Sequence, residues 1–136
     1  MYRPIALALT CLFVGAPAAE ATTRETKKRR EAVAFVKNKL GTWYQYGGTG
    51  PRYDCSGLVF AAYRKAGMAI PRTTGGQLAG MKRVSRRSLR PGDLVFESSG
   101  HVAMRVGGGR VIEAAKTGTQ VRYRDGYGVW AARTAF

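Results

Sequence analysis

The sequence predicts an α+β fold in which helices pack on an antiparallel β-sheet. Helical periodicity is confined to the first part of the chain, whereas short β-rich segments separated by Ser, Gly or Thr-Gly turns follow one another after residue 90. Helices first and neighbouring strands later are typical of this class. The length of 136 residues allows one domain and a short leader.

The first residues have the composition of a signal peptide. Arg3 supplies a positive charge, residues 5–15 are apolar, and small residues then allow cleavage after Ala18 or Ala21. A membrane anchor is the alternative, but the apolar run is shorter than the roughly 20 residues needed to cross a bilayer. We therefore expect residues 1–21 to be removed on export.

Two further expectations follow from this leader. A lipoprotein signal at Cys11 is disfavoured because Thr10 precedes the cysteine, and no other run is apolar enough to span a membrane. The mature domain is then residues 22–136, and it is expected to be secreted and monomeric.

The chain is strongly basic. It has 23 Lys and Arg against 8 Asp and Glu, which gives a net charge of +15, and two basic clusters lie at residues 24–30 and 82–90. A basic exported protein is expected to bind anionic wall polymers through its surface. Nucleic acid is not expected as a partner, because no zinc-finger, RNP or aromatic-interleaved basic pattern is present.

The first predicted helix spans residues 23–40. Thr22 and Glu25 fit a capping box at its start, and Gly41 follows its end. Its basic first turns are expected to face solvent. Its apolar positions recur at helical spacing: Ala32, Val33, Phe35, Val36 and Leu40.

The second predicted helix begins at Cys55 and ends before Gly67, with a single apolar face. A loop rich in Gly and Pro precedes it, at residues 42–52. A short helix is expected near residues 77–81. The predicted strands are 93–97, 101–106, 110–114 and 119–123, with a further strand within 128–136.

Cys55 is a candidate nucleophile. Without the leader it is the one cysteine of the chain, so no intramolecular disulfide can form. A thiol at a helix N-terminus is favoured as thiolate by the unpaired N–H groups and the helix dipole. The alternative is a buried, unreactive cysteine.

His101 is the only histidine and lies at the start of a predicted strand. A structural histidine is the alternative, but a cysteine nucleophile needs a base and no other imidazole is available. Glu113, across a predicted hairpin, is expected to orient the ring, with Glu97 as the competing carboxylate. One His and one Cys cannot fill a zinc shell, so we expect no metal and no cofactor.

Several motifs occur together along the chain. They are Tyr44-Gln-Tyr-Gly-Gly, Asp54-Cys55-Ser56-Gly57-Leu58-Val59, Ile70-Pro71-Arg72-Thr73, Gln77, Pro91-Gly92-Asp93-Leu94-Val95-Phe96 and His101-Val102. In this order and combination they resemble the NlpC/P60 family, papain-like cysteine peptidases that hydrolyse cell-wall peptides. The resemblance covers roughly residues 30 to 125 and implies a papain-like fold with the nucleophile at the N-terminus of the central helix.

The resemblance also implies residue roles. Cys55 matches the nucleophile and His101 the general base, while Tyr44 matches the tyrosine near the oxyanion and substrate positions. Asp54 and Ser56 match the pair that helps to hold the free amine of the substrate peptide. The implied function is a secreted peptidoglycan hydrolase that cleaves stem peptides between γ-D-glutamyl and a diamino acid.

Glu113 is the main departure from the family pattern. The family usually has His, and sometimes Asn or Gln, where this chain reads Ile112-Glu113-Ala114. A carboxylate can orient an imidazole and stabilise its cation, so activity is expected with an altered pH profile. Two alternatives stay open: an acyltransferase that uses the same thioester chemistry, and a basic wall-binding or antimicrobial protein on a degenerate scaffold.

Overall fold

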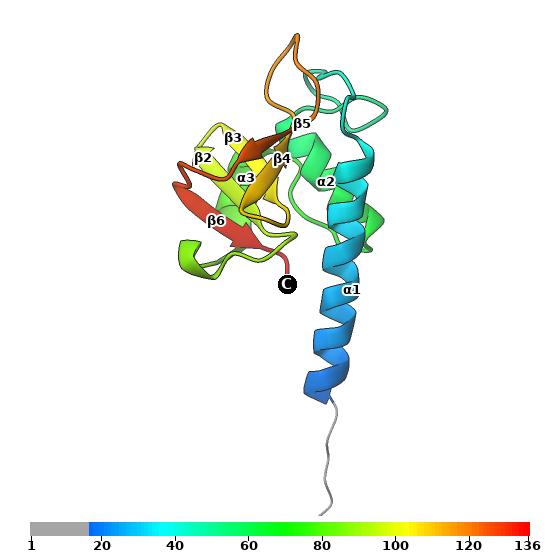
Figure 1. Cartoon of the computed structure of the whole chain (residues 1–136), viewed down its shortest axis with the longest axis vertical. Helices are drawn as coiled ribbons and strands as arrows, with labels where there is room; N and C mark the ends of the chain where they lie inside the picture. The colour runs from blue at the N-terminus through cyan, green and yellow to red at the C-terminus, as the bar shows by residue number, and fades with distance from the viewer. Residues whose placement is uncertain (1–16) are drawn as a thin grey trace, which may run out of the picture.

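The computed structural model describes residues 17–136 and confirms the α+β class (Figure 1). The helices are α1 (Pro17–Asn38), α2 (Cys55–Lys65) and α3 (Thr74–Gly80), with a 3-10 turn at Arg86–Ser88. The strands are β1 (Lys82–Arg83), β2 (Leu94–Ser98), β3 (His101–Arg105), β4 (Arg110–Glu113), β5 (Arg122–Asp125) and β6 (Ala131–Thr134).

The strands form one antiparallel sheet in the order β1-β6-β2-β3-β4-β5. Strands β2 to β5 follow one another along the chain as neighbours, as the sequence predicts. Strand β6 returns from the end of the chain and pairs with β2 on one side and β1 on the other. The predicted strand at 119–123 lies slightly later, at Arg122–Asp125, and β1 is not predicted.

Helices α1 and α2 pack together and cover one face of the sheet (Figure 1). The main core lies between these helices and the sheet, and its fully buried side chains include Leu58, Tyr63, Leu94, Phe96 and Met104. On the opposite face, a small cluster of Val95, Ala103 and Val111 packs against Leu89 and Val129 from flanking loops. Both faces of the central strands are therefore covered, which keeps their side chains fixed.

Helix α1 begins earlier than the sequence predicts. It starts at Pro17, so Thr22 lies within the helix and the predicted capping box is wrong. Three alanines between Pro17 and Thr22 favour this extension, because Ala has the highest helix propensity. Cys11 and residues 1–16 of the predicted signal peptide lie outside the described residues.

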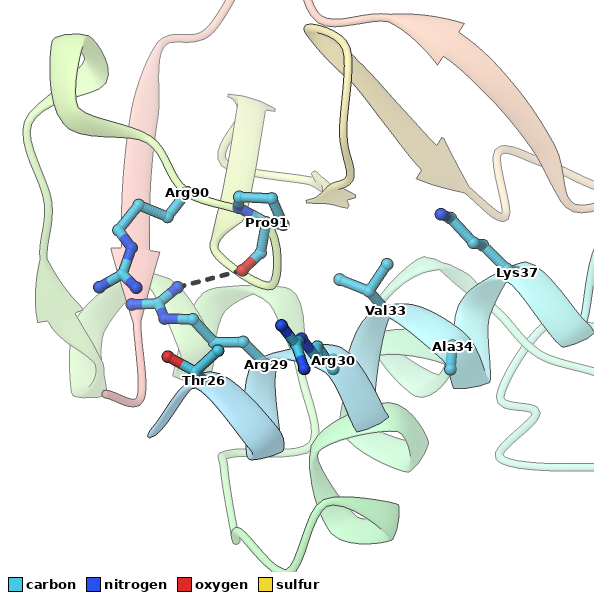
Figure 2. A pocket seen from close by; sticks show the side chains of 8 residues that line it. All are labelled: Thr26, Arg29, Arg30, Val33, Ala34, Lys37, Arg90 and Pro91. Atoms are coloured by element: carbon cyan, nitrogen blue, oxygen red, sulfur yellow. Dashed lines mark hydrogen bonds between the residues drawn. The ribbon is translucent and has the colours of Figure 1, made fainter. Parts of the chain in front are cut away.

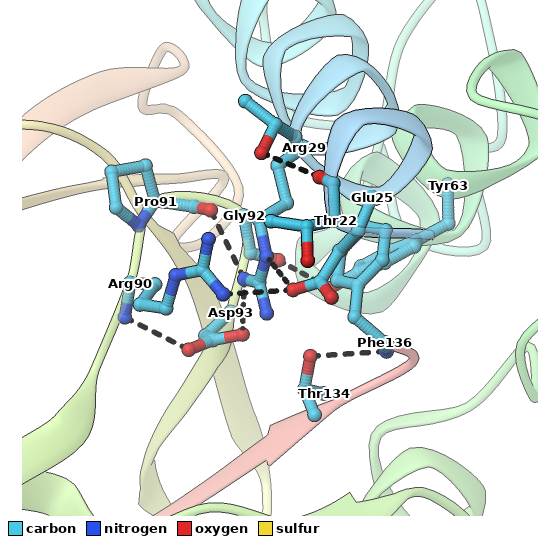
Figure 3. Close-up of polar contacts among 11 residues, drawn as sticks. Thr22, Glu25, Arg29, Tyr63, Arg90, Pro91, Gly92, Asp93, Thr134 and Phe136 are labelled. Atoms are coloured by element: carbon cyan, nitrogen blue, oxygen red, sulfur yellow. Dashed lines mark hydrogen bonds and ion pairs between the residues drawn. The ribbon is translucent and has the colours of Figure 1, made fainter. Parts of the chain in front are cut away.

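Arg29 corrects a second expectation about α1. Its side chain is buried, although the basic first turns are predicted to face solvent. Its guanidinium donates to the Asp93 carboxylate at 2.7 Å and to Glu25 at 2.8 Å, and it lies 4.3 Å from the centre of the Phe136 ring (Figure 3). Arg90 completes the cluster by donating to Glu25 at 2.9 Å. This network fixes α1 to the turn that leads into β2.

Helix α3 begins three residues before its predicted start. The side chain of Thr73 accepts a hydrogen bond from Gly76 N, which caps the helix at its first turn. The buried Gln77 then donates to the carbonyls of Ser56 and Pro71, at 3.2 and 2.9 Å. Helix α3 is therefore tied directly to the start of α2. Within residues 17–136, no helix is both long and apolar enough to cross a bilayer.

Candidate active site

Asp54 fixes the start of α2. It is the N-cap residue, and its carboxylate accepts a hydrogen bond from Gly57 N at 2.6 Å. Cys55 is then the first helical residue, where backbone N–H groups have no partner within the helix. The sequence therefore positions the thiol at the positive end of the helix dipole.

Gly57 allows the loop at residues 45–54 to pack closely against α2. A Cβ at Gly57 would lie 1.9 Å from the Gly48 carbonyl oxygen, and one at Gly48 would lie 2.3 Å from the Arg52 carbonyl oxygen. Because both obstructing atoms belong to the backbone, only glycine fits at these two positions. The close approach holds this loop, which directly follows Tyr44, against the start of α2.

The Cys55 thiol is half-buried and has three polar neighbours. Its Sγ lies 3.5 Å from Thr74 Oγ1, and the His101 ring and the Val102 backbone are near enough to act on its pKa. Burial alone raises the pKa of the thiol, but the hydrogen bonds from His101, Thr74 and Val102 outweigh burial and lower the pKa below its ordinary value. The site therefore favours thiolate.

His101 is the first residue of β3, directly after the hairpin turn that links β2 to β3. Its Nε2 lies 2.9 Å from Glu113 Oε1, which leaves Nδ1 for the Cys55 thiol. The hydrogen bond with Cys55, together with the one to Glu113, raises the pKa of His101 to about 9. At neutral pH the His101 ring is therefore protonated, and it lies beside a thiol whose own pKa is lowered.

Glu113 is the last residue of β4 and its side chain is 2% exposed. Besides His101, it contacts two arginines of β5: Arg124 Nε donates to Oε1 at 2.9 Å, and Arg122 Nη2 lies 3.1 Å from Oε2. Burial raises the pKa of Glu113, but the hydrogen bonds from His101 and Arg124 lower it to about 2. Glu97, the competing carboxylate, forms an ion pair with Arg124 instead.

Tyr44 lies at the same end of the molecule. Its backbone forms bridges with Tyr53 and donates to the Thr119 carbonyl, and its partly buried ring packs against the core. Burial, followed by the negative charges of Cys55 and Asp54, raises the pKa of its hydroxyl. Tyr44 therefore keeps its proton, and its hydroxyl can donate a hydrogen bond.

Asp54 and Ser56 lie on either side of the cysteine in sequence and both contact Arg72. The Asp54 carboxylate forms an ion pair with Arg72 at 3.0 Å, and Arg72 also donates to Ser56 Oγ at 2.9 Å. Gly47 N donates at 3.0 Å to Asp54 Oδ2, the oxygen that also pairs with Arg72. These groups form one connected polar cluster next to Cys55.

The sequence assigns no role to four residues of this site. Arg72 belongs to the Ile70-Pro71-Arg72-Thr73 motif and Thr74 follows it, and their proximity to the start of α2 depends on how α3 folds back on α2. Arg122 and Arg124 stand two residues apart, so they share one face of β5. Their alternation was a usable signal, but only the pairing of β5 with β4 identifies their partner.

Comparison with known proteins identifies relatives. Residues 41–135 match the model of the NlpC/P60 family. The chain is 41% identical over 101 residues to the probable endopeptidase p60 of Listeria monocytogenes, covering 71% of this chain and 20% of that protein. It is 34% identical over 107 residues to the murein DD-endopeptidase MepH of Escherichia coli, covering 71% of this chain and 40% of that protein.

The fold also matches a solved structure. NlpC1 from Trichomonas vaginalis superposes with a TM-score of 0.71 at 34% identity, over 79% of this chain and 43% of that one. The chain thus spans about a fifth to a half of the length of the curated relatives it matches.

Proposed function

The chain belongs to the NlpC/P60 family, and on that basis we propose that it is a peptidoglycan endopeptidase with Cys55 as its nucleophile. The observation that supports this proposal most is the series of contacts from Cys55 through His101 to Glu113. A cysteine nucleophile needs a base within hydrogen-bond reach and a third group that orients the base. Relatives that are called endopeptidases support the same reaction class.

In the proposed reaction, the Cys55 thiolate adds to the carbonyl carbon of an amide. The oxyanion accepts hydrogen bonds from the Cys55 backbone N–H and from the Tyr44 hydroxyl. The His101 imidazolium gives its proton to the leaving nitrogen, the C–N bond breaks, and an amine departs from a thioester. Water then attacks the thioester while His101 takes a proton from it, which releases the carboxyl product and the Cys55 thiolate.

Glu113 has an orienting role in this proposal. Its hydrogen bond with Nε2 directs Nδ1 of His101 towards the thiol, and its charge stabilises the imidazolium. The raised pKa of His101, about 9, supports a protonated ring that is ready to act as the acid at neutral pH. The departure from the usual family residue is thus compatible with catalysis.

The proposed substrate is a stem peptide of the cell wall, cut between γ-D-glutamyl and a diamino acid. Asp54 and Ser56 hold the free amine of this peptide, and the ion pair with Arg72 keeps the Asp54 carboxylate in place. One relative is called a DD-endopeptidase, so the bond is a feature to be measured for each chain. Action on the wall also implies that the protein works outside the cytoplasm.

Product analysis of digested wall fragments tests this proposal. Mass spectrometry of muropeptides treated with the protein should reveal new amine and carboxylate ends, and Cys55→Ala should produce none. Cys11→Ala is the matched control and should retain activity. Cleavage that persists in Cys55→Ala contradicts the proposal, and transfer of the acyl group to another amine would indicate an acyltransferase instead.

We also propose that the protein binds anionic wall polymers through a basic groove along α1 (Figure 2). The groove brings together residues from both basic clusters of the sequence. Arg30 and Lys37 are exposed on α1, and Arg90 reaches it from the turn before β2. Its lining is Thr26, Arg29, Arg30, Val33, Ala34, Lys37, Arg90 and Pro91. Clustered cations attract polyanions, and mobile ions screen that attraction.

Sedimentation with isolated cell walls tests the groove. Binding should weaken sharply as salt rises, and the double variant Arg30→Gln/Lys37→Gln should bind less than wild type. The matched control is Lys65→Gln/Lys116→Gln, which removes the same charge from residues that do not line the groove. Salt-independent binding, or equal loss in the two double variants, contradicts a role for the groove.

A further inference from the structure

The two arginines of β5 surround Glu113 in a way that the reaction scheme leaves unexplained. In the β4–β5 register Arg122 lies directly opposite Glu113, and Arg124 lies two residues further along the same face. Arg122 contacts Oε2 through Nε at 3.2 Å and Nη2 at 3.1 Å. Arg124 donates from Nε to Oε1, the oxygen that also faces His101.

Ion pairs link this cluster into one chain. Glu113 pairs with His101, Arg122 and Arg124. Arg124 in turn pairs with Glu97, which belongs to β2. The two arginines are thus matched by two carboxylates, and His101 lies between Glu113 and the thiol. A buried carboxylate without enough partners takes up a proton or leaves its position, so the 2% exposed Glu113 depends on partners of this kind.

We propose that Arg122 and Arg124 are positioning residues that keep Glu113 ionised and hold its Oε1 against Nε2 of His101. The proposal rests on the proposed function, because it assigns these arginines to the same Cys55 and His101. Their effect on the thiol is indirect. By fixing the carboxylate they fix the ring, and by adding positive charge they favour the thiolate.

The two arginines are expected to differ in the size of their effect on Cys55. Arg124 shares an oxygen with the imidazole, is 25% exposed and is itself held by Glu97. Arg122 contacts the far oxygen and is 51% exposed, so water and salt screen its charge more strongly. Replacement of Arg124 should therefore affect Cys55 more than replacement of Arg122.

The direction of the effect follows from electrostatics. In each single variant the other arginine still pairs with Glu113, so the carboxylate stays ionised. Removal of one cation then makes thiolate formation harder, because less positive charge remains near the sulfur, and makes imidazolium deprotonation harder for the same reason. The pH dependence of thiolate reactivity has an acid limb, on which the thiol ionises, and an alkaline limb, on which the imidazolium loses its proton. Both limbs therefore move to higher pH. A purely structural defect would lower the reactivity without moving both limbs together.

Alkylation of Cys55 by iodoacetamide across pH 4–10 tests the proposal. Mass spectrometry of the Cys55 peptide separates its signal from Cys11, and the assay needs no wall substrate. Failure of the proposed wall activity would therefore leave this readout intact. In Arg124→Gln we expect the acid limb to rise by about one pH unit, with a smaller rise in Arg122→Gln and partial restoration in Arg124→Lys.

Arg110→Gln is the matched control. Arg110 is an exposed arginine at the other end of β4 that lies 4.0 Å from the centre of the Tyr123 ring, so its loss should leave the limbs unmoved. Unmoved limbs in folded Arg124→Gln overturn the proposal. If that variant does not fold, the more exposed Arg122→Gln decides the matter: a rise supports the positioning role, and unmoved limbs in the folded variant refute it.

Discussion

Replacement of Glu113 by Gln should destabilise the fold in a pH-dependent way. The folded state lowers the pKa of Glu113 from 4.5 to about 2, and the side chain is 2% exposed. At about 1.4 kcal/mol per pH unit, this shift corresponds to roughly 3 kcal/mol of stability. The neutral amide of the variant lacks the charge that pairs with His101, Arg122 and Arg124, so the full difference should appear at neutral pH.

The sign of the pH dependence follows from linkage. A carboxylate whose pKa is lowered by folding stabilises the protein above its unfolded pKa, and that contribution is lost as pH falls through the folded pKa. Wild type and Glu113→Gln should therefore differ by about 3 kcal/mol at pH 7, converge as pH falls below about 4.5, and be nearly equal at pH 2.

Urea unfolding at pH 7, 5, 4 and 3 measures this difference directly. Glu31→Gln is the control, because Glu31 is 41% exposed and its ion pair with Lys27 of the same helix is long, at 3.9 Å. Its loss should cost less than about 1 kcal/mol at any pH. A Glu113→Gln variant that matches wild type at pH 7, or one whose deficit does not change with pH, would refute the ionised and paired state of Glu113.

Three further predictions concern the core, the loop packing and the reaction. Arg29→Met should lower the free energy of unfolding in urea by about 3–5 kcal/mol, because it leaves the buried Asp93 without its ion pair. Arg90 is exposed, so the control Arg90→Gln should cost under about 1 kcal/mol. Equal losses in the two variants would contradict this account. Gly57→Ala should lower folded yield and activity, since its Cβ would meet the Gly48 carbonyl at 1.9 Å, whereas Gly75→Ala, with open space around it, should resemble wild type. The pH profile of kcat/KM should fall above about pH 9, where His101 loses the proton destined for the leaving amine, and a constant rate to pH 10 would be inconsistent with that role.

The sequence predicts those elements whose signals are local. Helix α2 has a regular apolar face and a terminal Gly67, and the structure agrees with its predicted bounds to within one or two residues. Strand β1 has no such signal. It is two exposed residues, Lys82–Arg83, and it exists because β6 pairs with it from the far end of the chain.

The positions of charged residues are harder to predict from sequence. Most charged side chains are exposed, but an individual one can be buried when tertiary structure gives it a partner. Arg29 reads as part of a solvated basic run, yet it is buried against Asp93, which lies 64 residues away. Arg122 and Arg124 likewise read as surface charges until strand register brings them to Glu113. A motif can indicate that Cys55 and His101 act together, but the residues that support them depend on tertiary pairing.

Strand β6 has a consequence for the order in which the fold assembles. It fills the position between β1 and β2, both of which come earlier in the chain, and the following Phe136 packs on Tyr63 and Arg29. Until residues 131–134 arrive, one edge of β2 has no hydrogen-bonding partner and β1 has no sheet to join. Closure of such distant pairings is slow compared with local helix formation. The sheet therefore cannot be completed before residues 131–134 have been synthesised.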